Sequence, residues 1–221
     1  MHVKAVLFDI DGTLIDTNDF HVLAWEEAFL GEGHTIDREA IHDQIGKGAD
    51  NLVPTLLPQA DKAMQERLGE AHGDIFKRKY LKTAKPFPDA RALLERVHAS
   101  GQKIVWASSA SKGELDHYLD LLDAHGLVSA TTSIDDVGQS KPAPDIFAIA
   151  MRKVAPLSPN EAIVVGDTPY DIEAARKCGI DTVALRSGGF PDDDLRDAGA
   201  VALYDDISVL LREYDKSPLN Q

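Results

Sequence analysis

Cysteine and long apolar runs are nearly absent from this chain. Its 221 residues contain one cysteine, Cys178, so no disulfide can form within the chain. No stretch approaches the roughly 20 apolar residues of a membrane-spanning helix. The first residues also lack the charged region and apolar core of a signal peptide. These absences exclude a disulfide framework and a membrane protein, and they lead us to expect a cytoplasmic protein.

Positive charge is scarce as well. Lys and Arg total 23 against 37 Asp and Glu, which gives a formal net charge of -14. This charge repels nucleic-acid backbones and anionic membrane surfaces, so we expect neither as a partner. The eight histidines form no H-x-x-x-H or Cys/His cluster, so they are predicted to be scattered surface or packing residues and not zinc ligands. An anionic substrate therefore needs a local cation.

The apolar content of 43% is enough for a substantial core, and its pattern changes along the chain. The first part is predicted to be helical, with helices at 18–30, 37–45, 50–57 and 59–81, the last interrupted by Gly69 and Gly73. From residue 86 helices alternate with strands, which are predicted at 103–107, 130–133, 162–165, 182–185 and 201–203. Such alternation predicts a parallel sheet covered on both faces. Residues 216–221 are expected to fray.

Two aspartates follow the first apolar run, residues 3–8, within the segment DIDGTLIDT. Because strand side chains alternate between faces, Asp9 and Asp11 can share a pocket only if the chain leaves the strand there, which Gly12 permits. One carboxylate can attack phosphorus, and the other can protonate the leaving oxygen and later activate water. A divalent cation would offset the charge. An acidic turn after a strand is the alternative interpretation.

Three further segments place polar residues just past a predicted strand or at a helix entrance. Ser108 and Ser109 can offer hydroxyls and amides to phosphate oxygens, or can cap the following helix. Lys141, in SKPAPD, is a candidate charge clamp. Asp167, in GDTPYD, can bind a hard cation, and Asp171 lies about one helical turn further on. Open parallel sheets bind ligands at the carboxyl ends of their strands, so these groups should meet near the first aspartate.

These segments together resemble the haloacid dehalogenase superfamily of aspartyl-nucleophile phosphotransferases, over nearly the whole chain. Its four motifs appear in order as DIDGTLIDT, the serine of WASSA, the lysine of SKPAPDIF, and GDTPYD. The resemblance implies that Asp9 is the nucleophile and a Mg²⁺ ligand. It implies that Asp11 is the acid/base and lends its backbone carbonyl to the metal, that Asp167 is the third protein ligand, and that Asp171 holds metal-bound water.

The resemblance also implies that Ser108 and Lys141 clamp the phosphate. It implies a Rossmann-like, doubly wound α/β core made of residues 1–15 and 86–221. A small α-helical cap, residues 16–85, would be inserted after the first strand and close over the site on hinges at 15–18 and 83–88. A closing cap needs one free face, so we expect a monomer. The expected activity is Mg²⁺-dependent hydrolysis of a small phosphorylated metabolite.

Four other functions are alternatives to this one. Asp11 argues against the dehalogenases and the phosphonate-cleaving branch, which lack an acid/base aspartate at that position. β-Phosphoglucomutase is harder to separate, because DTNDFHVLAW resembles the start of its cap, including His21, which helps to position the acid/base. The cap loop IGKGADN lacks the mutase arginine for the distal phosphate, although Lys47 is a partial substitute, and Gly166-Asp167 replaces a Glu-Asp pair. A binding module without chemistry is a distant alternative, since the charged motif residues are all present.

Overall fold

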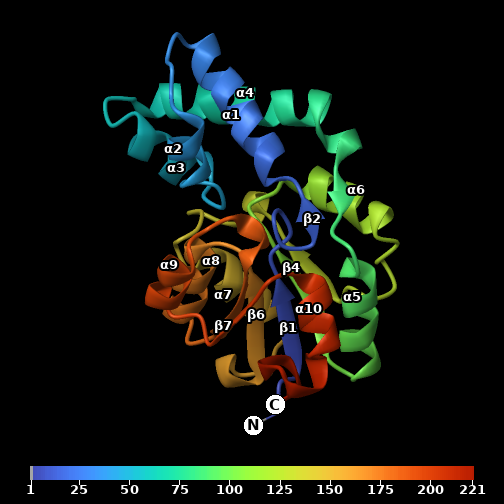
Figure 1. Ribbon diagram of the computed structural model, residues 1–221. Coiled ribbons are helices and arrows are strands. Elements are labelled where there is room, and N and C mark those ends of the chain that lie inside the picture. Colours follow the sequence, from blue (N-terminus) through green and yellow to red (C-terminus); the bar gives the residue numbers. More distant parts are fainter. Residues whose placement is uncertain (1) are drawn as a thin grey trace.

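The fold is an α/β fold built on a parallel six-stranded sheet (Figure 1). The computed structural model describes residues 2–221, so Met1 of the predicted core range lies outside the described residues. The strand order is β5-β4-β1-β6-β7-β8, and all neighbours are parallel. The strands are β1 (Ala5–Phe8), β4 (Lys103–Ala107), β5 (Ala130–Thr132), β6 (Ala162–Gly166), β7 (Asp181–Leu185) and β8 (Ala202–Tyr204). Because the sheet extends to both sides of β1, the predicted doubly wound class is confirmed.

Helices cover both faces of this sheet, which explains why all four residues of β1 are buried. Val6 and Phe8 face one apolar cluster, and Ala5 and Leu7 face another, as the alternation of a strand requires. The covering helices are α5 (Ala90–Ala99), α6 (Lys112–Leu121), α7 (Asp145–Lys153), α8 (Pro169–Lys177), α9 (Asp192–Ala198) and α10 (Ile207–Arg212). In Figure 1, α5 and α10 lie on one side of β1, whereas α7 and α8 lie on the other.

Four helices form a separate layer above the carboxyl ends of the strands (Figure 1). They are α1 (Asn18–Gly31), α2 (Arg38–His42), α3 (Ala49–Leu56) and α4 (Lys62–Lys79). This helical unit, residues 18–79, has its own apolar cluster, which includes Phe29, Leu52 and Phe76. Two short antiparallel strands, β2 (Ile15–Asp16) and β3 (Lys85–Pro86), carry the chain into and out of it. The two connections therefore lie side by side.

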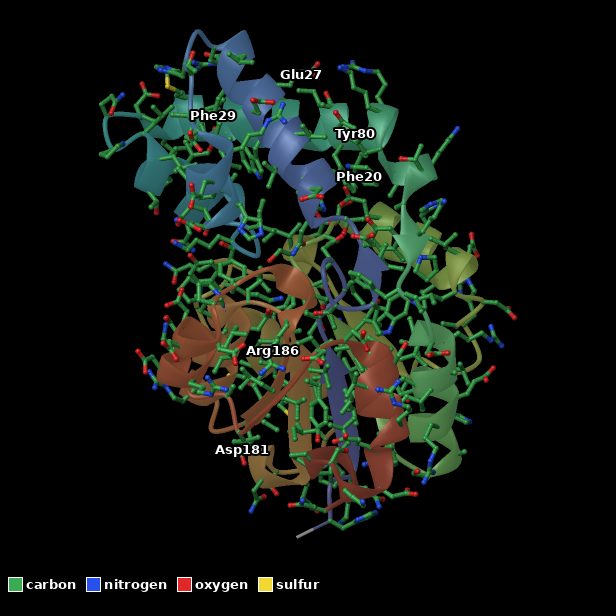
Figure 2. All side chains as sticks on the ribbon, viewed as in Figure 1. Phe20, Glu27, Phe29, Tyr80, Asp181 and Arg186 are labelled. Carbon is green, nitrogen blue, oxygen red and sulfur yellow. The ribbon has the colours of Figure 1, made fainter. Side chains whose placement is uncertain are left out.

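An aromatic pair marks the base of the helical unit. Figure 2 shows Phe20, near the start of α1, beside Tyr80, just after α4, and their stacked ring centroids are 5.3 Å apart. This contact joins the first and last helices of the unit where the chain enters and leaves it. Among the helices of residues 2–221, none is both long enough and apolar enough to cross a membrane.

Two predictions from the sequence were wrong, one about an interrupted helix and one about a frayed C-terminal tail. Gly69 and Gly73 do not interrupt α4, which is continuous from Lys62 to Lys79. The C-terminal tail does not fray: Leu219 is fully buried, and the amide of Val3 donates to the carbonyl of Gln221 at 2.8 Å. The side chain of Gln102 also donates to the carbonyl of Leu219 at 2.6 Å. Tertiary packing and hydrogen bonds therefore outweigh the local tendency of both segments.

Candidate active site

The turn after β1 brings two aspartates to the carboxyl edge of the sheet. Asp9 is buried, and its amide continues the ladder by donating to the carbonyl of Val165 in β6 at 2.9 Å. Gly12 then adopts a φ of +75°, and a Cβ there would lie 2.1 Å from Asp167 Oδ2. Only glycine combines this backbone conformation with such a close approach. The glycine thus allows the Asp9–Asp11 turn to pack directly against the loop after β6.

Lys141 is buried under this turn and joins two carboxylates. Its Nζ lies 2.5 Å from Asp9 Oδ1 and 2.6 Å from Asp171 Oδ1. Burial lowers the pKa of Lys141, but attraction to Asp171 and Asp9 outweighs burial and raises that pKa above its ordinary value. The lysine is therefore a fixed cation beside Asp9. Its direct contact with Asp171 was not foreseen from the sequence, which suggested a role for that aspartate toward metal-bound water.

Three carboxylates, those of Asp9, Asp167 and Asp171, each place an oxygen within 4.8 Å of the others. Burial, with repulsion from Asp171, raises the pKa of Asp167 to about 7. Burial also raises the pKa of Asp9 well above its ordinary value, although Lys141 opposes this rise. One lysine thus faces three carboxylates in a buried site. A cluster of hard oxygen donors with unbalanced negative charge suits a small divalent cation.

Asp167 is held in place by residues from the loop after β1 and the start of the helical unit. Its Oδ1 accepts a hydrogen bond from Thr13 Oγ1 at 2.8 Å, and its Oδ2 accepts one from Asn18 Nδ2 at 2.9 Å. Gly188 approaches so closely that a Cβ there would lie 2.3 Å from Asp167 Oδ2. These neighbours hold the carboxylate in its present orientation. Neither Thr13 nor Asn18 was singled out from the sequence.

Asp11 lies in a different hydrogen-bond environment. Its Oδ1 accepts from Thr17 Oγ1 at 2.7 Å and from the hydroxyl of Tyr118 at 3.2 Å, and His21 Nε2 lies 3.3 Å from the same oxygen. Ser108 Oγ lies 3.5 Å from Oδ2. Burial raises the pKa of Asp11, but the nearby His21 ring and the hydrogen bonds from Thr17 and Tyr118 outweigh burial and bring this pKa below its ordinary value. The two aspartates of one motif thus have opposite pKa shifts.

A cavity of about 540 Å³ opens above Asp9 and Asp11, between the sheet and the helical unit. Its lining includes four more of the residues predicted from the sequence: His21, Lys47, Ser108 and Ser109. All four already have partners within the protein. Ser109 Oγ donates to the carbonyl of Gly46 at 3.1 Å, so this serine contacts the helical unit.

Lys47 belongs to the helical unit and lines the same cavity. Its Nζ donates to Gln44 Oε1 at 2.6 Å and lies 4.3 Å from the centroid of the Tyr170 ring. Burial lowers the pKa of Lys47. The cation therefore lies over an aromatic ring at the cavity wall, where a bound anion would be an additional partner.

The loop before α3 joins the helical unit to the sheet. Gly48 donates its amide to Ser140 Oγ at 2.9 Å, and the amide of Ser140 donates in return to Asp50 Oδ2 at 3.0 Å. The side-chain amide of Asn51 donates to the carbonyls of Ser140 and Lys141 at 3.1 and 3.3 Å. The helical unit is thus docked on the segment that carries the buried lysine. Sequence reasoning singled out none of Gly48, Asp50, Asn51 or Ser140 for this contact.

Comparison with known proteins agrees with this geometry. The family described as haloacid dehalogenase-like hydrolase matches residues 6–185, so the chain belongs to that family. A phosphoglycolate phosphatase of Aquifex aeolicus is 29% identical over 192 residues, covering 85% of this chain and 86% of the relative. A crystal structure of a hydrolase from Pseudomonas syringae has a TM-score of 0.89 and 31% identity, and the match covers 96% of this chain and 98% of that one. The protein is therefore an enzyme of the phosphatase class within this family.

The fold alone does not separate hydrolases from mutases. A solved structure from Bacteroides vulgatus, whose description suggests a β-phosphoglucomutase, also has a TM-score of 0.89. Its identity to this chain is 24%, over 100% of this chain and 91% of the other. Sheet and helical layers are thus shared by proteins described by different reactions, and the residues of the site have to decide between them.

Proposed function

We propose that this enzyme is a Mg²⁺-dependent phosphatase that hydrolyses small phosphorylated metabolites through an aspartyl-phosphate on Asp9. The observation that carries the proposal is the buried Asp9 carboxylate, 2.5 Å from the Lys141 ammonium and at the floor of a cavity of about 540 Å³. A carboxylate beside a fixed cation can meet an anionic phosphoryl group without full charge repulsion.

The metal ligands proposed from the residues present are Asp9 and Asp167, with the backbone carbonyl of Asp11. Asp171 lies close enough to hold water on the cation, because one of its oxygens is within 4.8 Å of those of Asp9 and Asp167. When bound, Mg²⁺ would supply positive charge to the nucleophile and to the phosphoryl oxygens. The excess of carboxylates over lysine in this group supports the assignment.

The chain's own residues account for the remaining steps. Lys141 and Ser108 would bind phosphoryl oxygens while a carboxylate oxygen of Asp9 forms a bond to phosphorus. As the bond from phosphorus to the leaving oxygen breaks, Asp11 would give that oxygen its proton. Asp11 would then accept a proton from water as the water attacks the aspartyl-phosphate, which releases inorganic phosphate and restores Asp9.

We further propose that residues 16–85 act as a cap on a core of residues 1–15 and 86–221. The adjacent strands β2 and β3 support hinges at 15–18 and 83–88, because both connections leave the core at one place. The hydrogen bonds around Ser140 would hold the cap closed and exclude water during phosphorylation. The cap would also supply Lys47 to the far end of the substrate.

Replacement of Asp9 by asparagine tests the proposal. Asp9→Asn keeps the shape of the side chain but removes the anionic nucleophile, so hydrolysis of p-nitrophenyl phosphate with Mg²⁺ should fall by at least about 10³-fold. The matched control is Asp116→Asn, the same change on an exposed face of α6. Mass spectrometry after rapid acid quenching should find one added phosphoryl group in the parent and none in Asp9→Asn. Near-normal turnover by Asp9→Asn, checked for deamidation, would rule out covalent catalysis by this residue.

A further inference from the structure

A second histidine of the helical unit lies behind His21. His72, on α4, is half-buried and places its Nε2 3.2 Å from His21 Nδ1. The other ring nitrogen of His21, Nε2, lies 3.3 Å from Asp11 Oδ1. The side chains of Asp11, His21 and His72 therefore form a continuous row from the predicted acid/base into the helical unit.

Two aromatic rings fix the orientation of this row. The Trp25 ring stacks on His72, with centroids 4.1 Å apart and an interplanar angle of 10°. The Phe76 ring stacks on His21 at 3.9 Å and 12°. Stacking restrains the plane of each imidazole, so the nitrogens that face each other have few alternative partners. The hydrogen bond then depends on which nitrogen carries the proton.

The tautomers of the two rings are linked through the contact between them. Burial lowers the pKa of His72 well below its ordinary value, so this ring is neutral and carries one N–H. If that N–H is on Nε2, it donates to His21 Nδ1. The tautomer of His21 with a bare Nδ1 then carries its proton on Nε2, 3.3 Å from Asp11 Oδ1. If His21 instead carried its proton on Nδ1 and donated it to His72, the unprotonated Nε2 of His21 would lie beside the Asp11 carboxylate.

We propose that His72 is a positioning residue for the acid/base, an inference that rests on the phosphatase function proposed above. Its Nε2–H selects the tautomer of His21 that donates to Asp11. After Asp11 has given its proton to the leaving oxygen, the new carboxylate is stabilised by His21 Nε2–H. No proton passes along the row. The contribution of His72 to the rate of phosphorylation is therefore largest when the leaving group needs a full proton, and smallest when the leaving group is already stable as an anion.

Two variants separate the hydrogen bond from the packing of the ring. His72→Phe keeps an aromatic ring against Trp25 but has no N–H, whereas His72→Gln keeps an N–H near the position of Nε2 and loses the ring. His98→Phe, on the exposed face of α5, controls for the substitution itself. Circular dichroism and thermal melting establish that each variant folds. If His72→Phe does not fold, His72→Gln and the parent protein still test the proposal by the spectroscopic measurement below.

The kinetic test compares phenyl phosphate with p-nitrophenyl phosphate, which are close in size but differ in leaving-group basicity. In single-turnover phosphorylation, His72→Phe should lose about 10-fold more rate with phenyl phosphate than with p-nitrophenyl phosphate, the scale of one hydrogen bond to a charged system. His72→Gln should recover most of that difference. Equal losses with both esters, or no recovery by glutamine, would overturn the positioning role.

A measurement without substrate or metal tests the tautomer directly. Long-range ¹H–¹⁵N spectra of the parent protein should show His21 protonated on Nε2 and not on Nδ1, and His72→Phe should show a mixture of tautomers. Protonation of His21 on Nδ1 alone in the parent would overturn the proposal. If the parent hydrolyses neither ester, the phosphatase proposal fails while the spectra still report on the His72–His21 contact. If it hydrolyses both and the variants behave like the parent, only the positioning role fails.

Discussion

The side-chain amide of Asn51, in the helical unit, donates a hydrogen bond to the backbone carbonyl of Lys141 at 3.3 Å. The same lysine extends its Nζ to Asp9 and Asp171. One residue therefore contacts both the helical unit and the proposed nucleophile. We infer that docking of the helical unit and placement of the buried cation depend on each other.

Replacement of Asn51 by alanine should weaken this docking. The variant loses hydrogen bonds to Ser140 and to Lys141, so kcat/KM for p-nitrophenyl phosphate should fall about 10-fold, at roughly 0.5–1.5 kcal/mol for each bond. Thr55→Ala is the matched control, because its hydroxyl bonds only within α3, to the carbonyl of Asn51. Steady-state kinetics of the two variants checks this. An Asn51→Ala enzyme as active as Thr55→Ala would show that docking does not limit turnover.

Asp11→Asn should separate the two halves of the reaction. Asparagine cannot give up a proton, so phosphorylation of Asp9 should slow strongly with an alkyl ester such as glycerol 2-phosphate and much less with p-nitrophenyl phosphate. Rapid-quench measurement of the first turnover checks this, with Asp16→Asn on the exposed end of β2 as the control. The same rate loss with both esters would contradict a role as general acid.

The fold was predictable because its signals are local. In β1, β4 and β6, apolar runs end at polar residues, and parallel pairing of these strands necessarily brings their carboxyl ends together. The glycines of α4 suggested an interruption that does not occur, because the loss of helix stability that they cause, about 1 kcal/mol each, is small beside the packing of a long helix. The order of the tail was not predictable because Leu219 is held by Gln102, 117 residues earlier in the sequence, and no local pattern links two residues so far apart.

Some residues of the site could not be predicted from the sequence for the same reason, because they meet only through long-range contacts. His72 and His21 are 51 residues apart, and no spacing rule links two histidines on different helices. The sequence could identify His21 only through its place beside the first motif. Asn51 and Ser140 are similarly far apart, and polar residues of this kind occur in most loops. Contacts between units depend on tertiary geometry that local periodicity does not encode.

Lys47→Ala should distinguish substrates by their far end. If Lys47 binds a second anionic group, kcat/KM for an anionic metabolite such as phosphoglycolate should fall about 10-fold or more, whereas p-nitrophenyl phosphate should be nearly unaffected. Lys79→Ala is the control, since that lysine is exposed and paired with Glu27. Parallel losses with both substrates would indicate that Lys47 acts only by packing over Tyr170.

Assays with glucose phosphates, on the parent enzyme and on Lys47→Ala, decide whether the enzyme is a hydrolase or a mutase. With β-glucose 1-phosphate we expect the parent enzyme to form at most inorganic phosphate, and no glucose 6-phosphate even when glucose 1,6-bisphosphate is supplied. The reason is that Lys47, already bonded to Gln44, is a weak anchor for the distal phosphate of a bisphosphate. Rapid formation of glucose 6-phosphate, abolished by Lys47→Ala or His21→Ala, would establish the mutase instead.

Stabilisation by Mg²⁺ should increase with pH. In the metal-free protein the pKa of Asp167 is raised to about 7, against about 3.9 in an unfolded chain. The folded state therefore binds more protons between about pH 4 and 7, so metal-free stability falls as the pH rises through this window. Mg²⁺ needs the ionised carboxylate and removes this penalty. Thermal melting with EDTA or MgCl₂ should show a larger Mg²⁺-dependent rise in Tm at about pH 8 than at about pH 5. A rise independent of pH would contradict the assignment.

Two alanine substitutions in α4 should differ in their effect on stability. Gly69 and Gly73 both line the cavity, one helical turn apart. A Cβ on Gly73 meets no atom within 4 Å, so Gly73→Ala should raise the free energy of unfolding by about 0.5–1 kcal/mol through helix propensity. A Cβ on Gly69 would lie 2.8 Å from the Cβ of Ala49, so Gly69→Ala has to separate α3 from α4 and should not stabilise. Urea unfolding measures both changes, and equal stabilisation by the two alanines would show that α3 yields to the added methyl group.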